Sequence, residues 1–124
     1  MIRQPFNDIS PDEADADLSQ ALGLAQAMFV ELIVERIMAF EAYRKLASLS
    51  DQPQLEMAKI ADIAHKISGV GATLGFGKAG ALAAELDRAI SDNPARLANP
   101  DYLKQVVDPR LEALLDELES LLDA

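Results

Sequence analysis

The stretch Ile60–Phe76, IADIAHKISGVGATLGF, holds the single histidine of the chain and three of its six glycines. Read at about 100° per residue, its apolar residues fall on one side of a helix, as in a helix that packs against a core. These residues are Ile60, Ile63, Ile67, Val70 and Leu74. His65 points away from them, so the spacing predicts a helix whose histidine faces solvent.

The residues that share the helix face of His65 are mostly small. Neighbours three, four and seven positions away along a helix lie on the same face, and here they are Ala61, Asp62, Ser68, Gly69 and Ala72. Glycine inside a helix costs about 1 kcal/mol relative to alanine. We therefore expect Gly69 and Gly71 to permit the close approach of another protein, with Ala61 and Ala72 as part of the docking surface.

The string AHKISGVGATLGF, residues 64–76, resembles the signature of histidine-containing phosphotransfer (Hpt) domains. In that signature an Ala-His pair is followed by a glycine four residues after the histidine and by Leu-Gly nine and ten residues after it. The matching residues are Ala64, His65, Gly69, Leu74 and Gly75. The chain departs from the family at Ser68, where most members have lysine, and Lys66 directly follows the histidine instead.

The resemblance implies a phosphorelay carrier in which His65 accepts a phosphoryl group from one response-regulator receiver domain and passes it to another. It also implies a hybrid histidine kinase as a candidate partner. The receiver would bring its own Mg²⁺, so we expect no cofactor, no metal site and no nucleotide-binding enzyme site in this chain.

Several charged residues are candidates for the surroundings of the phosphohistidine. Lys66, Lys59 and Arg88 could hold its oxygens, Arg88 because an antiparallel helix would bring it level with His65. Asp62 could accept a hydrogen bond from the second ring nitrogen and so select the tautomer. On the preceding long helix, Val34 and Met38 should be level with His65, and we expect them to add exposed apolar area to the docking surface.

The first part of the chain reads as two helices. Met1–Ile9 is irregular. Ser10 as N-cap, Pro11 at the first position and Glu13 as capping-box partner then start a short acidic helix that runs to about Leu22. Gly23 ends or bends this helix, and a long helix follows over residues 24–49.

The remaining chain reads as three further helices. One spans residues 54 to about 74 and ends at Gly75 as a left-handed C′ residue, and the next spans about 78–91. Asn99 caps a helix that begins at Pro100, and Asp108-Pro109 either kinks it or restarts it. The final segment carries an apolar stripe that packs in the bundle or forms a short coiled-coil seam. This stripe consists of Leu111, Leu114, Leu115, Leu118, Leu121 and Leu122.

These patterns predict an all-α fold, an antiparallel up-and-down four-helix bundle with a short extra N-terminal helix, in one domain over residues 1–124. The net charge of −10 disfavours nucleic-acid and membrane-surface binding. The chain has no cysteine, and it shows no signal-peptide pattern and no membrane span. We expect a monomer in the cytoplasm.

Two further readings stay open at this point. A helical docking module could bind receiver domains without carrying phosphate, a reading motivated by Ser68, and a purely structural bundle subunit would do neither. Zinc is disfavoured because one histidine and no cysteine cannot supply three or four ligands. The glycines of residues 69–80 lack the spacing of a phosphate-binding loop.

Overall fold

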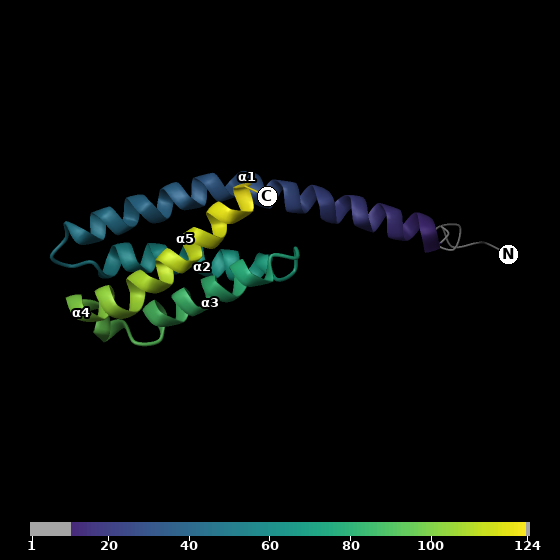
Figure 1. Ribbon diagram of the computed structural model, residues 1–124. Helices are drawn as coiled ribbons and strands as arrows, with labels where there is room; N and C mark the ends of the chain where they lie inside the picture. The colour runs from purple at the N-terminus through teal and green to yellow at the C-terminus, as the bar shows by residue number, and fades with distance from the viewer. Residues whose placement is uncertain (1–10, 124) are drawn as a thin grey trace.

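The computed structural model describes the backbone of residues 11–123 and the side chains of residues 15–123. Throughout this range the regular structure is helical (Figure 1). The four long helices are α1 (Pro11–Ser48), α2 (Gln54–Gly71), α3 (Gly77–Ser91) and α5 (Asp108–Asp123). Three short helical segments join α3 to α5, namely η2 (Pro94–Ala98), α4 (Pro100–Tyr102) and η3 (Leu103–Val107).

The long helices enclose a common core. Figure 1 shows α2 returning alongside the C-terminal half of α1, and α2 also packs against α3. The fourth helix, α5, packs against both α3 and α1. Among the residues described, no helix combines the length and the apolarity that crossing a bilayer requires.

The N-terminal part of the chain differs from the prediction. The short helix ending near Leu22 is wrong, because α1 runs unbroken through Gly23 from Pro11 to Ser48. A single glycine weakens a helix without ending it when good helix formers flank it on both sides. Met1–Ile9, the Ser10 cap and the Glu13 side chain lie outside the described residues.

The apolar periodicity predicted most of the core correctly. On α1 the apolar residues Phe29, Ile33, Phe40 and Ala47 recur at helical spacing and are buried. Val70 and Leu122 are exceptions, since both are exposed. Val70 is 45% exposed because it borders an open pocket between α1 and α2, and Leu122 lies in the last turn of α5. The buried leucines of α5 are Leu111, Leu114, Leu115 and Leu118.

The turn from α2 to α3 confirms the prediction for Gly75. Gly75 adopts φ +90°, the left-handed region that glycine occupies without a steric penalty. The Phe76 N–H donates to the Gly71 carbonyl at 2.7 Å, and the Gly75 N–H donates to the Ala72 carbonyl at 3.3 Å. This pair of hydrogen bonds is a Schellman motif. It ends the regular part of α2 at Gly71, earlier than the predicted Leu74.

Glycines also set the spacing of α2 and α3. A Cβ atom placed on Gly71 would lie 3.0 Å from the Cα and N atoms of Gly80 in α3, whereas one on Gly69 would meet no atom within 4 Å. The close approach predicted for Gly71 therefore serves α3 of the same chain. Gly69 remains exposed on the outer side of α2.

The C-terminal helical segments follow the predicted signals closely. The Asn99 side chain accepts a hydrogen bond from the Asp101 N–H at 2.9 Å and caps the helix that begins at Pro100. The π-helical turn η3 lies directly before Asp108-Pro109. Such a turn accommodates the absence of a backbone N–H donor at the proline. The helical path therefore continues through Pro109 with altered winding.

The helix spacing gives a stability prediction. Gly71→Ala should lower the free energy of unfolding by about 1–3 kcal/mol, because the added methyl group meets a backbone that cannot yield. Gly69→Ala is the matched control and should raise it by about 0.4–1 kcal/mol, because alanine favours the helix and the site is open. Urea unfolding followed by circular dichroism measures both values. Equal effects of the two substitutions would contradict the proposed role of Gly71.

Candidate functional site

His65 lies on the outer side of α2. Its side chain is 75% exposed, while Ile60, Ile63 and Ile67 are buried. The burial of these isoleucines fixes the rotation of α2 and turns the histidine to solvent. The predicted exposure of His65 is confirmed.

Asp87 of α3 is the residue that contacts the imidazole. His65 Nδ1 lies 3.1 Å from Asp87 Oδ2, and the Ser91 hydroxyl donates to Asp87 Oδ1 at 2.9 Å. The side chain of Asp87 is only 22% exposed. One carboxylate oxygen is therefore held by α3 itself and the other by the histidine, which ties the ring of α2 to the neighbouring helix.

This contact selects the tautomer of His65. An ionised carboxylate only accepts hydrogen bonds, so Nδ1 donates and carries the proton. In the neutral ring Nε2 then keeps its lone pair. Since Nδ1 is engaged with Asp87 on the α3 side, Nε2 is the nitrogen left available for a bond to an incoming group.

Asp62 does not have the role predicted for it. It forms an ion pair with Lys66 one helical turn away, with a distance of 3.0 Å between Lys66 Nζ and Asp62 Oδ2. The hydrogen bond from Lys66 lowers the pKa of the Asp62 carboxyl, and the charges of Lys66, Lys59 and His65 lower it further. Asp87, which the sequence reasoning missed, hydrogen-bonds the ring instead.

Ser68 is also engaged locally. Its hydroxyl donates to the main-chain carbonyl of His65 at 2.7 Å, three residues back along the helix. The hydroxyl therefore caps a carbonyl of α2 rather than bonding to the ring. The predicted small surface next to it is present, because Gly69 and Ala72 are both exposed.

Arg88, predicted as a neighbour of the site, borders a separate polar pocket together with Arg96, Arg110 and Tyr102. The hollow beside His65 is bordered by Asp87 instead. Consecutive residues of a helix point about 100° apart, so the neighbouring Asp87 meets the histidine while Arg88 faces the following segments. The residue of α3 that contacts the imidazole is thus the carboxylate of Asp87 and not the predicted cation.

The predicted docking residues divide into three cases. Ala72 is exposed near the histidine face, whereas Ala61 is 6% exposed, which corrects its assignment to the outer surface. Val34 and Met38 are exposed as predicted. However, Arg36 lies between them in sequence and borders the α1–α2 pocket, and residues two positions apart point to opposite sides of a helix. Val34 and Met38 therefore face away from α2.

A hollow that was not predicted lies beside the histidine. It has a volume of about 490 Å³ between α2, α3 and η2, and it is bordered by His65 and Asp87. Ala61 contributes to it from α2, and Pro94 and Leu97 from η2. Within residues 15–123, no three side chains of the metal-binding types come together at this site or elsewhere.

Comparison with known proteins agrees with this geometry. The family model described as "Hpt domain" matches residues 12–121, which is most of the chain. No curated protein and no solved structure matches the chain. The match includes α2 with His65 and α3 with Asp87. The chain therefore belongs to the Hpt domain family, whose members are phosphocarriers of two-component phosphorelays and work with response-regulator receivers and histidine kinases.

Proposed function

We propose that this chain carries a phosphoryl group on Nε2 of His65, taking it from the aspartyl phosphate of one receiver domain and passing it to another. The observation that supports this proposal is the hydrogen bond between Nδ1 and Asp87, combined with the exposure of the ring. A nucleophilic imidazole needs one nitrogen with a free lone pair that a partner protein can reach. His65 meets both requirements.

The transfer is an in-line displacement at phosphorus. The lone pair of Nε2 forms the N–P bond, the P–O bond to the receiver's aspartate breaks, and the departing electron pair stays on that carboxylate. A receiver domain would supply Mg²⁺ to neutralise charge on the phosphoryl oxygens, so we expect this chain to need no cofactor of its own. Positioning and charge neutralisation provide most of the rate enhancement in such reactions.

Asp87 stabilises the charge that the reaction creates on the ring. Because Nδ1 keeps its proton while Nε2 bonds to phosphorus, the imidazole becomes cationic as the N–P bond forms. The Asp87 carboxylate lies 3.1 Å from Nδ1 and balances this charge, and Ser91 holds the carboxylate in place. In the second transfer the N–P bond breaks, and the ring returns to the neutral tautomer that the same contact favours.

Lys66 is the cation that we assign to the phosphoryl oxygens. Its ion pair with Asp62 is exposed at both ends, and exposed pairs of this spacing contribute little to stability. A phosphoryl group on the neighbouring histidine carries more charge than one carboxylate and can compete for the ammonium. Lys66 would then replace the lysine that most family members have at the position of Ser68.

The receiver docks over the face of His65, with the exposed Gly69 and Ala72 on one side and the hollow beside Asp87 on the other. One copy of the chain is enough for this chemistry. We propose that it acts as an antiparallel four-helix bundle in the cytoplasm.

The alternative function, docking without phosphate transfer, uses the same surface. It differs only in whether a bond to Nε2 forms.

Phosphate labelling separates these two functions. Incubation of the protein with a receiver domain phosphorylated on aspartate should label it with acid-labile, alkali-stable phosphate, and His65→Gln should abolish the label because no other histidine exists. Both proteins should bind the receiver equally in a pull-down experiment. Binding of the wild-type protein without any label would refute the phosphocarrier proposal and favour the docking module.

The role of Asp87 is tested with a matched pair of substitutions. Asp87→Asn should slow phosphotransfer by roughly 10- to 100-fold. The substitution removes the negative charge that orients the ring of His65 and balances its positive charge. Asp62→Asn makes the same change at a carboxylate that pairs with Lys66 rather than with the ring, and it should leave the rate within about threefold, since an exposed pair contributes little. Single-turnover transfer measures the rates, and ¹⁵N shifts of the imidazole report the tautomer. An unchanged rate and tautomer in Asp87→Asn would contradict this role.

A further inference from the structure

The N-terminal part of α1 extends past the rest of the bundle (Figure 1). The Gln26 side chain donates to the Leu74 carbonyl at 2.7 Å, and Phe29 stacks on Phe76, so the edge of the bundle lies at about this level. Every side chain from residue 15 to residue 24 is exposed. With a rise of 1.5 Å per residue, the extension over residues 11–25 is about 22 Å long.

This extension carries an apolar stripe that has no partner within the described chain. Leu18 and Leu22 are exposed, Leu18 by 71%. Together with Ala25, Phe29 and Leu32, they repeat at spacings of four and three residues, the pattern of a seam between two helices. Of these five residues only Phe29 is buried, and Leu32 is 44% exposed at the edge of a pocket between α1 and α2. The apolar stripe is therefore largely uncovered from Leu18 to Leu32.

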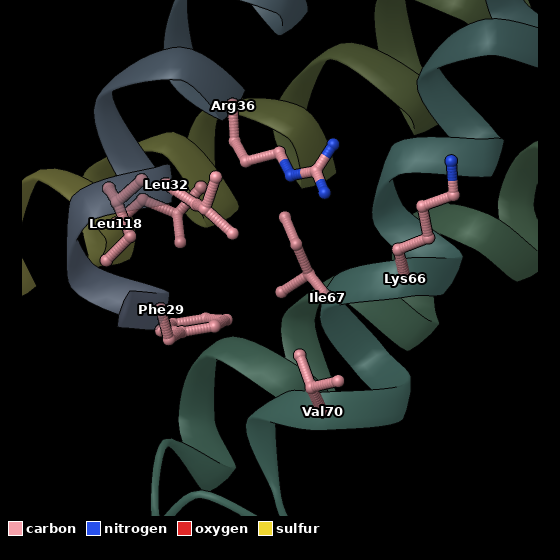
Figure 2. A pocket seen from close by; sticks show the side chains of 8 residues that line it. Phe29, Leu32, Arg36, Lys66, Ile67, Val70 and Leu118 are labelled. Atoms are coloured by element: carbon pink, nitrogen blue, oxygen red, sulfur yellow. The ribbon is translucent and has the colours of Figure 1, made fainter. Parts of the chain in front are cut away.

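An open apolar pocket lies where the stripe enters the bundle. It has a volume of about 190 Å³ and lies between α1 and α2, with Leu118 of α5 as a further wall. Figure 2 shows the apolar side chains of α1 and α2 on either side of its opening, and the charged ends of Arg36 and Lys66 beyond Ile67 at one end. The apolar lining consists of Phe29, Leu32, Ile33, Ile67, Val70 and Leu118.

We infer that a second copy of this chain covers the stripe and fills the pocket, in an antiparallel dimer in which Leu18 of each copy packs into the pocket of the other. The extension cannot reach the pocket of its own chain, because it leaves the bundle as one continuous helix. The α1 helix of a second copy carries apolar residues at the same spacing. A two-fold arrangement makes each contact twice.

Charge determines the direction of pairing. No lysine or arginine occurs between Arg3 and Arg36, and the exposed end of the extension carries Asp15 and Asp17. Antiparallel pairing with Leu18 opposite Leu32 brings this acidic end to the partner's Arg36. Parallel pairing would place the two acidic ends side by side, which is repulsive.

Apart from Lys66, which borders the pocket and is also assigned to the phosphoryl oxygens, this surface is separate from the phosphotransfer face. Lys66 points about 100° away from His65 around α2, and it borders the pocket on the α1 side, whereas Asp87 and the hollow lie on the α3 side. The dimer therefore leaves both histidines accessible. The inference does not rest on the proposed function, and it differs from the monomer expected from the sequence.

Sedimentation equilibrium of the full chain tests the dimer. The wild-type protein should reach twice the 13.4 kDa of one chain as its concentration rises through the micromolar to millimolar range. Leu18→Asp should weaken the association by at least about 100-fold, because the change enters the dimer twice. Leu24→Asp is the control, since Leu24 is 65% exposed on the same extension and points about 120° from Leu18. It should dimerise like the wild type.

Engineered cysteines test the direction, because the chain has no native cysteine. A mixture of the Leu18→Cys and Leu32→Cys proteins should form the mixed disulfide on oxidation in preference to either homodimer. Asp15→Lys and Arg36→Glu should each weaken the dimer, and the double variant should recover it. A monomeric wild type at all concentrations, equal effects of Leu18→Asp and Leu24→Asp, or preferential linkage of two Leu18→Cys chains to each other would each overturn the inference.

Discussion

The close packing of α2 on α3 is the constraint on which the site depends. Gly71 and Gly80 bring the two backbones together at one end, and both helices also bury small alanines, namely Ala61, Ala64, Ala79 and Ala83. Small side chains shorten the distance between helix axes. Only at such a distance can a carboxylate as short as that of Asp87 reach the ring of a residue that points to solvent.

The contact with Asp87 orders the imidazole of His65 and still leaves it accessible to a partner protein. A side chain that is 75% exposed normally samples several rotamers, and ordering it costs conformational entropy. The contact with Asp87 orders the ring from one edge and leaves the other edge open. The carboxylate belongs to a neighbouring rigid helix and is itself hydrogen-bonded to Ser91. The site is thus preorganised without being buried, which suits a group that must meet a partner protein.

The two sides of α2 divide the surface of the molecule. Toward α3 the side chains are small or polar and surround the histidine, whereas toward α1 they are apolar with cations at the rim. The sequence pattern separated most of the buried from the exposed side of the helices, with Ala61, Val70 and Leu122 as exceptions. It failed on the neighbours: Arg88 was chosen where Asp87 lies, and Val34 and Met38 were expected beside the histidine although they face away from α2. Periodicity gives the angle about one helix axis, but it does not give the direction in which the next helix lies.

The sequence by itself determined the helical fold, the outward histidine, the left-handed Gly75 and the Asn99 cap, because each depends on interactions within about one helical turn. The tertiary structure alone decided which residue holds the imidazole, which helix Gly71 approaches and how far α1 extends beyond its neighbours. These features depend on the rotation and spacing of helices distant in sequence. Those follow from the combined packing of the whole core, which no local pattern encodes.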